Sequence, residues 1–442
     1  MKKLDRVPKT KIERATKLMK VGAKVGGNYI KYVGNRMFSS EEEAREKLNV
    51  ANADSIYDGL SELKGSALKM AQMMSMDDSI LPKAYVEKFS LAQFSVPPIS
   101  GPLVRKVITK ELGASPSQIF DTFNSDSKFA ASIGQVHQGT KDGQKLAIKV
   151  QYPGVADSIG SDLQLVKPFA LRMFNLKSEE VEDYFDEVKS KLYEETDYQL
   201  EMNSLKRIRQ DCAGFPNLQI PKVYEEYSSK GVLTMEWMDG LHLSEFVKTE
   251  ASELDRKKVA QTLWDFYLYQ IHHLRRVHAD PHPGNFKVSA KIELIGLDFG
   301  CMKDIPEDFY HSYFKLIEIT NITNKDKFNQ ILAELEIFSE SDSEDDRILI
   351  SDVFEKLLLI INKPFQSEKF DFSDPHYFGE LMTLGKELKD NKNLRKLKGS
   401  RGSKHFLYVN RTLFGLLGLM NSLHGGEIEV NNYKHYLPKK VA

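Results

Sequence analysis

The stretch "HADPHPGNF", residues 278–286, decides the fold of this chain. Two prolines and a glycine within nine residues exclude a helix or a regular strand and predict a loop. This loop carries Asp280 and, after four intervening residues, Asn285. Thirteen positions later Asp298 follows an apolar run in "LIGLDFG". Two carboxylates and an amide on loops beside short strands are typical of phosphoryl transfer, where Mg²⁺ takes oxygen ligands.

The spacing of these groups assigns a role to each. Asp280 with Asn285 fits the D-x-x-x-x-N catalytic loop, and Asp298 fits the DFG metal ligand. We therefore predict that Asp280 is catalytic and receives or orients an attacking hydroxyl, and that Asn285 and Asp298 hold Mg²⁺ on the phosphates of ATP. In "LAIKV" Lys149 closes a strand-like run of the V-A-I-K form, which predicts a second catalytic group facing phosphate and a carboxylate.

A phosphate-binding loop is expected just upstream of Lys149. "AASIGQVHQG", residues 130–139, joins small side chains to a strand, and small side chains let backbone N–H groups approach phosphate. The usual G-x-G-x-x-G is absent. The nucleotide contacts predicted here, together with two at the end of the strand-like "GVLTMEWMDG", are Ala130, Ala131, Ser132, Gly134, Gln135, Glu236 and Met238.

Two helical patterns complete the predicted site. A long one from Glu179 to about Gln210 should supply the carboxylate for Lys149, and it offers Glu194, Glu195, Asp197 and Glu201. The other covers residues 41–76, with an apolar stripe of Leu60, Leu63, Ala67, Ala71 and Met74. Lys69 and Gln72 flank that stripe on a shared edge, so Lys69 is a second cation in need of a partner.

These motifs together resemble the AarF/UbiB atypical kinases, the ubiquinone-biosynthesis kinase-like family, over about residues 45–425. The family's K-x-G-Q helix, alanine-rich loop, E-x-D motif and catalytic loop appear as "KMAQ", "AASIGQVH", "ETD" and "HADPHPGN". The resemblance implies an α+β, protein-kinase-like two-lobe fold with an added N-terminal helical domain packed over the cleft. It also implies that Glu201 contacts the nucleotide lysine, Lys149. Two departures stand out: Ala71 replaces the glycine of K-x-G-Q, and Phe129 stands where a run of three alanines usually begins.

The resemblance further assigns a regulatory group. It implies that Glu195 and Asp197 together hold Lys69 near the nucleotide, with Gln72 on the same helix. We expect four segments: a basic arm over residues 1–38, a helical extension over 39–114, a kinase-like N-lobe with a helical insert over 115–240, and a mostly helical C-lobe over 241–442.

The composition limits the kinds of molecule and compartment that we expect for this chain. The 442 residues carry a net charge of -1, which gives no global attraction to nucleic acid. The two cysteines, Cys212 and Cys301, show no metal spacing, and a reducing, cytoplasmic compartment is expected.

No apolar run reaches the roughly 20 residues of a membrane span; the closest, residues 412–423, predicts a buried C-terminal helix. The arm over residues 1–38 is rich in Lys and Arg and fits either a poorly ordered tail or a basic amphipathic segment on anionic lipid.

The sequence therefore predicts an ATP- and Mg²⁺-dependent atypical kinase or ATPase. The resemblance implies a role in quinone or other isoprenoid lipid metabolism, with peripheral membrane attachment and lipid-biosynthesis enzymes as candidate partners. Two alternatives remain: a kinase for a protein or small metabolite, and a non-enzymatic, nucleotide-gated scaffold for lipid enzymes. Gly300 is followed almost at once by a helical pattern, which leaves little room for a peptide platform and weakens the protein-kinase alternative.

Overall fold

The computed structural model describes residues 8, 10–35, 40–63, 65–74, 82–90, 98–131, 133–174, 178–391, 393–394 and 401–437. The chain divides into two compact units. The first comprises Met1–Asn203 and Lys222–Trp237, and the second comprises Ser204–Pro221 and Met238–Ala442. Helix α9 (Tyr198–Asp211) begins in the first unit and ends in the second.

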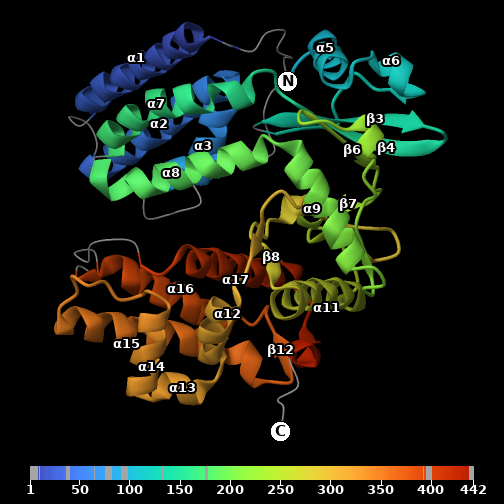
Figure 1. The fold of residues 1–442 in the computed structure, drawn as a ribbon. Helices are drawn as coiled ribbons and strands as arrows, with labels where there is room; N and C mark the ends of the chain where they lie inside the picture. The colour runs from blue at the N-terminus through green and yellow to red at the C-terminus, as the bar shows by residue number, and fades with distance from the viewer. Residues whose placement is uncertain are drawn as a thin grey trace. The chain divides into compact units, whose positions relative to one another are not determined.

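The first unit contains an antiparallel five-stranded sheet (Figure 1). Its order is β1-β3-β4-β6, with β2 also paired to β3. The bounds are β1 Thr122–Phe123, β2 Phe129–Ala130, β3 Gly134–Lys141, β4 Gln144–Gln151 and β6 Val232–Glu236. In the central strand β4, Leu146, Ile148 and Val150 are fully buried against helix α5 and its neighbours, whereas the side chain of Lys149 lies on the opposite face. The alternation of strand side chains thus separates a core face from a face that carries the predicted nucleotide lysine.

Helices of the first unit form a second core. They are α1 Lys11–Asn35, α2 Glu41–Leu63, α3 Ser66–Met74, α4 Lys83–Ser90, α7 Val155–Phe174 and α8 Ser178–Glu195. The helices α5 Gly101–Leu112 and α6 Pro116–Ile119 and the 3₁₀ turn η2 Glu225–Tyr227 contribute to the core of the sheet instead. The predicted apolar stripe is buried in the helical core at Leu60, Leu63, Ala67 and Ala71, and the Met74 side chain lies outside the described residues. Met70 is also fully buried, as core filling requires.

Both predicted long helices are interrupted. The pattern over residues 41–76 is split between α2 and α3 at Gly65, whose φ of +73° is left-handed and cannot continue a right-handed helix. The pattern over 179–210 is split between α8 and α9, because Asp197 leaves helical geometry and its Oδ1 accepts the Gln199 N–H as an N-cap (3.1 Å). The prediction of one continuous helix from 179 to 210 was therefore wrong.

The basic N-terminal arm is helical over α1, despite its glycines. Helix α1 lies along α2 and α7 (Figure 1). Arg14 of α1 is 3% exposed and forms a two-pronged ion pair with Asp162 of α7, which is 1% exposed (Nε–Oδ1 2.5 Å, Nη2–Oδ2 2.6 Å). A buried bidentate pair of this kind fixes one end of α1 to the helical core.

The second unit is mostly helical and contains three small sheets. Strands β5 Leu218–Gln219, β10 Leu294–Gly296, β9 Phe286–Val288 and β7 Leu241–His242 form one; β11 Met302–Asp304 pairs with β8 Arg276–His278; and β12 Lys369–Asp371 pairs with β13 Glu427–Glu429. The helices are α10 Leu243–Phe246, α11 Glu253–Tyr269, α12 Glu307–Phe314, α13 Ile319–Thr323, α14 Lys325–Glu334, α15 Glu344–Ile361, α16 Pro375–Asp390 and α17 Lys404–Leu423. Shorter turns are η3 Gln270–Leu274, η4 Pro283–Asn285, η5 Lys315–Ile317, η6 Lys363–Gln366 and η8 Asn432–Tyr436.

One prediction for this unit is confirmed: the apolar run at residues 412–423 lies in the buried helix α17. Strands β9 and β10 pair as an antiparallel hairpin. Both cysteines are free thiols. Among the described helices, none combines the length and the apolar character that crossing a bilayer demands.

Candidate nucleotide site

In the first unit, Lys149 and Glu201 form the central ion pair. Lys149 Nζ donates to both carboxylate oxygens of Glu201, each at 2.8 Å, as the resemblance implies. Lys149 lies on β4, while Glu201 is buried in the first turn of α9. The ring of Tyr198 lies below the ammonium group, 5.0 Å from Nζ to the ring centroid. The lysine is thus held on a sheet by a helix-borne carboxylate, which is the arrangement expected for a kinase nucleotide lysine.

The two acids of the E-T-D segment have different partners. Lys69 Nζ lies 3.0 Å from Glu195 Oε2, so α3 is tied to the end of α8. Asp197 instead pairs with Lys230 (Nζ–Oδ2 3.3 Å). The expectation that both carboxylates hold Lys69 was therefore correct for Glu195 and wrong for Asp197. The reason is the helix break: Asp197 precedes α9, where its carboxylate accepts the Gln199 N–H and contacts Lys230.

The alanine-rich loop forms a tight turn between β2 and β3. Ala130 pairs with Gln135 in the sheet, and the Ala131 N–H donates to the Gly134 carbonyl (2.8 Å). A Cβ on Gly134 would lie 2.5 Å from the Tyr198 hydroxyl and 2.8 Å from a backbone carbonyl oxygen. Only glycine fits at this position, where the loop, β4 and the start of α9 meet.

The side chain of Gln135 has a structural role that sequence reasoning missed. It is 1% exposed, its Oε1 accepts the Ile99 N–H (2.9 Å) and its Nε2 lies 2.9 Å from His137 Nε2. A nucleotide contact at Gln135 would therefore come from its backbone. Ser132 lies outside the described residues, as does the side chain of Gln72 on α3.

The two remaining predicted nucleotide contacts lie where the chain leaves the first unit. Glu236 ends β6, and its Oε2 accepts the Lys222 N–H at 3.2 Å. Met238 begins the next segment of the second unit, where its carbonyl accepts a hydrogen bond from Lys287 Nζ (3.2 Å). Burial lowers the pKa of Lys287 from its ordinary value. The Lys287 side chain therefore holds the backbone at Met238, while the Glu236 side chain holds the backbone at Lys222.

In the second unit, the catalytic-loop motif is compact and internally bonded. Asn285 Nδ2 donates to the Asp280 carbonyl (2.9 Å) and lies 3.3 Å from Asp280 Oδ2. The His282 N–H donates to the same Asp280 carbonyl (2.8 Å), and His282 Nδ1 accepts the Gly284 N–H (3.0 Å). These bonds give the proline-rich loop one conformation and hold the Asp280 and Asn285 side chains together.

Asp298 lies across the β9–β10 hairpin from this loop. The Leu297 N–H donates to the Asn285 carbonyl (2.9 Å), so Asn285 and Asp298 leave neighbouring strand ends. Asp298 Oδ1 accepts the Gly300 N–H (2.9 Å) and turns the chain after the DFG motif.

The donor chemistry at these strand ends fits Mg²⁺. Because the Asn285 amide nitrogen donates to Asp280, its oxygen is the atom left to bind a cation, and Asp298 adds a carboxylate. No cluster of three or more His, Cys, Asp or Glu able to hold a metal occurs within the described residues. Mg²⁺ would therefore need phosphate and water oxygens as further ligands, as it does in kinases.

Two further groups at the catalytic loop were not predicted. Arg411 of α17 lies 3.5 Å from Asp280 Oδ1. His278 is buried, its N–H donates to Gln270 Oε1 (2.9 Å), and its ring packs on Phe299 of the DFG motif with centroids 5.4 Å apart. Burial lowers the pKa of His278, which keeps the imidazole neutral near pH 7. An arginine directly before the apolar run of residues 412–423 was the available signal for Arg411.

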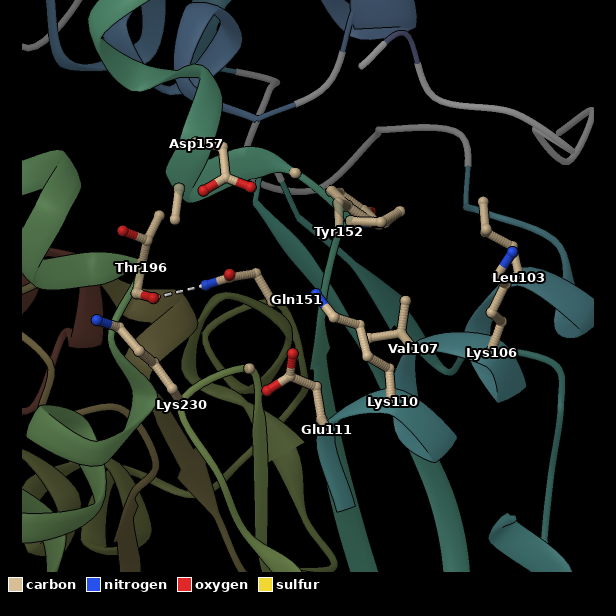
Figure 2. A pocket seen from close by; sticks show the side chains of 14 residues that line it. Leu103, Lys106, Val107, Lys110, Glu111, Gln151, Tyr152, Asp157, Thr196 and Lys230 are labelled. Atoms are coloured by element: carbon tan, nitrogen blue, oxygen red, sulfur yellow. Dashed lines mark hydrogen bonds between the residues drawn. The ribbon is translucent and has the colours of Figure 1, made fainter. Parts of the chain in front are cut away.

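A pocket of about 470 Å³ lies in the first unit beside the E-T-D segment (Figure 2). Gln151 from the end of β4 donates to the Thr196 carbonyl there (2.9 Å). Lys106 and Lys110 from α5 line another side. Neither Lys149 nor Glu201 lines this pocket, so it is distinct from the predicted nucleotide contacts.

Comparison with known proteins identifies the family. The ABC1 atypical kinase-like domain matches residues 91–332, more than half of the chain. The chain is 32% identical over 304 residues to Protein ACTIVITY OF BC1 COMPLEX KINASE 8, chloroplastic, of Arabidopsis thaliana, covering 64% of this chain and 40% of that protein. It is 30% identical over 336 residues to Atypical kinase COQ8, mitochondrial, of Saccharomyces cerevisiae, covering 74% of this chain and 66% of that protein. The chain thus spans less than two thirds of the length of these relatives.

A solved structure supports the fold. The Rv3197–erythromycin complex from Mycobacterium tuberculosis superposes with a TM-score of 0.61 at 22% identity, over 90% of this chain and 98% of that one. This likeness and the mixed helix and sheet architecture bear out the α+β, kinase-like fold. On its motifs, its fold and the match over residues 91–332, the chain belongs to the ABC1 atypical kinase-like family, the family of the AarF/UbiB kinases.

Proposed function

We propose that the chain binds MgATP and acts as an atypical kinase or ATPase of the UbiB type at a membrane surface, in support of quinone or other isoprenoid lipid metabolism. The observation that carries the proposal is the two-pronged ion pair of Lys149 with Glu201. Because the ion pair already holds the lysine side chain in place, its ammonium group can bind phosphate oxygens without a further loss of side-chain entropy.

The second unit supplies the remaining roles. Asp280 orients or receives the proton of the attacking hydroxyl, and its position is held by Asn285 and Arg411. Asn285 and Asp298 would hold Mg²⁺, which when bound neutralises charge on the phosphates. In the first unit, Lys69, tied to Glu195, adds a regulatory cation.

A short connection after the DFG motif favours an acceptor other than a peptide. Gly300 is followed by β11, which begins at Met302, and α12 begins at Glu307. Protein kinases display their peptide on a long segment at this point. A small acceptor or water therefore suits the chain better than a protein substrate.

Thermal shift with MgATP tests nucleotide binding. We expect stabilisation of the wild type, and we expect Lys149→Met and Asp298→Asn each to abolish it, because one removes the phosphate cation and the other a metal ligand. Asp304→Asn, an exposed acid in β11, is the matched control and should keep the shift. Equal stabilisation of wild type and Asp298→Asn would contradict the metal assignment.

The fate of the γ-phosphate separates the candidate reactions. Labelled ATP is incubated with the chain, anionic liposomes and cell lipid extract. Free phosphate indicates an ATPase, labelled extract a small-molecule kinase, and labelled protein the protein-kinase alternative. Absence of all three, with MgATP bound, favours the nucleotide-gated scaffold.

Helix α1 supports membrane attachment. It carries five lysines and one arginine against a single acid, and several of its large apolar side chains are exposed, among them Ile12, Ile30 and Val33. Basic and apolar groups on one helix favour an anionic bilayer surface, at on the order of 1 kcal/mol per basic residue.

Substituting the exposed apolar side chains of α1 tests this membrane attachment more specifically than deleting the arm. Deleting residues 1–38 would remove Arg14 and leave Asp162 buried without its cation. We therefore expect Ile12→Ser with Ile30→Ser and Val33→Ser to lose flotation with anionic liposomes, and salt to weaken flotation of the wild type. Unchanged flotation would move the lipid contact away from α1.

A further inference from the structure

Helix α17 lies beside strand β8, which leads into the catalytic loop of the second unit (Figure 1). Tyr408, Arg411 and Gly415 are spaced by three and four residues, so they share one side of the helix. Arg411 and Gly415 meet the catalytic loop itself. Tyr408 meets the strand after the DFG motif, where Lys303 Nζ lies 5.2 Å from the tyrosine ring centroid. One side of α17 thus contacts the chain both before and after the predicted metal ligands.

Gly415 lets the helix pack directly against Pro281 of the catalytic loop. A Cβ built on Gly415 would overlap the Pro281 Cγ and lie 3.4 Å from the Cβ and Cδ of the same ring. Because ordinary contact between such carbons begins near 3.4 Å, a methyl group here would displace the loop or the helix by about 1 Å. Glycine weakens the interior of a helix, so what it contributes at this position is room for Pro281.

Arg411 contacts Asp280, the residue next to Pro281. Its Nη2 lies 3.5 Å from Asp280 Oδ1, and the two side chains are 34% and 27% exposed. The other carboxylate oxygen, Asp280 Oδ2, lies 3.3 Å from Asn285 Nδ2. One oxygen therefore faces a cation on α17 and the other faces an amide within the loop. Rotation of the carboxylate would lose both contacts, so together they define its plane.

Helix α17 is itself held at both ends. The Ser403 hydroxyl oxygen accepts the Phe406 N–H (3.4 Å) and caps the first turn. At the other end, Arg256 Nη1 donates to the Leu423 carbonyl (3.2 Å). Buried side chains along the whole helix pack it into the core of the second unit. Because a packed helix holds its side chains more precisely than a loop does, α17 can fix the position of the loop beside it.

We propose that α17 positions the catalytic loop, with Gly415 seating Pro281 and Arg411 orienting the carboxylate of Asp280. Both are positioning residues, because they act on the reaction through Asp280. In that reaction the acceptor oxygen attacks the γ-phosphorus, the bond to the β–γ bridging oxygen breaks as ADP leaves, and Asp280 receives the hydroxyl proton. The inference deepens the kinase or ATPase function proposed above and rests on it.

Two glycines of α17 provide a matched pair of variants. Gly415→Ala adds a methyl group against Pro281, whereas Gly418→Ala adds one where a Cβ meets no atom within 4 Å. Both changes raise the helix propensity by the same amount, so a difference between them reports the contact with the loop. At Arg411, Arg411→Met removes the charge and Arg411→Lys keeps it.

The assay is release or transfer of the γ-phosphate of labelled MgATP in a single turnover, with cell lipid extract present and MgATP affinity measured in parallel. We expect Gly415→Ala to lower the rate constant by about 10²-fold, the effect of a misplacement of about 1 Å, and Gly418→Ala to leave it unchanged. Arg411→Met should lower it about tenfold, and Arg411→Lys should recover part of the loss. The MgATP affinity of all four variants should equal that of the wild type, because none of these residues is a predicted nucleotide contact.

The Asp280→Asn background decides whether the two residues act through Asp280. There Arg411→Met and Gly415→Ala should cause no further loss of rate, because the carboxylate that they position is gone. Full additivity with Asp280→Asn would overturn the inference, and so would equal rates for Gly415→Ala and Gly418→Ala. A loss of MgATP affinity that matches the loss of rate would also overturn it, since a general disturbance of the fold gives that pattern.

Circular dichroism checks the fold of each variant. If Gly415→Ala does not fold, the cycle of Arg411→Met with Asp280→Asn decides the question, because Arg411 is partly exposed and its truncation adds no atoms to the interface. A wild type that leaves the γ-phosphate of MgATP in place would refute the proposed function and this inference with it. Turnover by the wild type without the expected differences between variants would refute this inference alone.

Discussion

Lys69 has two candidate carboxylates close along the chain, and the structure pairs it with only one of them. Its Nζ is 3.0 Å from Glu195, and both side chains are mostly shielded, with 18% and 26% exposed. Asp197 pairs with Lys230, whose side chain is 67% exposed. We predict that double-mutant cycles will rank these contacts: strong coupling for Lys69 with Glu195, weak coupling for Lys230 with Asp197, and none for Lys69 with Asp197.

The magnitudes follow from distance and exposure. At 3.0 Å the Coulomb attraction is about 5 kcal/mol with an effective dielectric constant of about 20. Desolvation and side-chain entropy offset most of it, so we expect a coupling of about 1–2 kcal/mol for Lys69 with Glu195, between the values for exposed and buried pairs. For Lys230 with Asp197 we expect no more than about 0.5 kcal/mol, the range of exposed pairs.

The assay is urea unfolding of Lys69→Ala, Glu195→Gln, Asp197→Asn and Lys230→Ala, and of the three double variants, followed by far-UV circular dichroism. The coupling is the difference between the double variant and the sum of the single ones. Measuring the MgATP affinity of the same variants shows whether the Lys69–Glu195 pair also affects nucleotide binding.

One pattern would refute the reasoning. If Lys69 couples to Asp197 as strongly as to Glu195, the two acids act as a joint clamp, and the helix break at Asp197 does not separate them. Additivity of Lys69 and Glu195 within about 0.3–0.5 kcal/mol would show that their contact contributes nothing to stability.

Three further predictions concern buried charges. Lys149→Ala should lower the free energy of unfolding by about 3 kcal/mol, because Glu201 keeps its charge in a buried position, and Glu201→Gln should restore part of the loss in urea unfolding. Arg14→Met should cost about 3–5 kcal/mol by leaving Asp162 unpaired; a loss below about 1 kcal/mol, measured the same way, would show that the pair is not formed. Burial raises the pKa of Asp265 to about 6, so the folded state holds a proton that the unfolded state releases near pH 4. Raising the pH from 4 to 6 should therefore lower stability by about 2–3 kcal/mol, and Asp265→Asn should remove this fall in urea midpoints measured across that range.

The sequence by itself determined the family, the fold class and the order of the motifs. It could do so because each motif is local: prolines and glycine force the loop at Asp280, a β-rich run places Lys149 on a strand, and helical periodicity marks Leu60 and Leu63 as core. Local backbone preferences and the alternation of apolar residues are properties of short stretches of sequence, so a single sequence is enough to recover them. The pairing of Lys149 with Glu201 followed only from the resemblance, because the spacing left four acids open.

Only the tertiary structure decided which charges meet and which helices end early. Asp197 caps α9 and pairs with Lys230, not with Lys69. The side chain of Gln135 is buried and hydrogen-bonds the Ile99 N–H. Arg411 contacts Asp280, which lies 131 positions away in the sequence. The glycine-rich α1 formed a helix because Arg14 and its apolar face are buried against α2 and α7, although its intrinsic propensity is poor. Contacts between residues far apart in sequence depend on how elements pack, and packing energy exceeds the small local preferences that a single sequence displays.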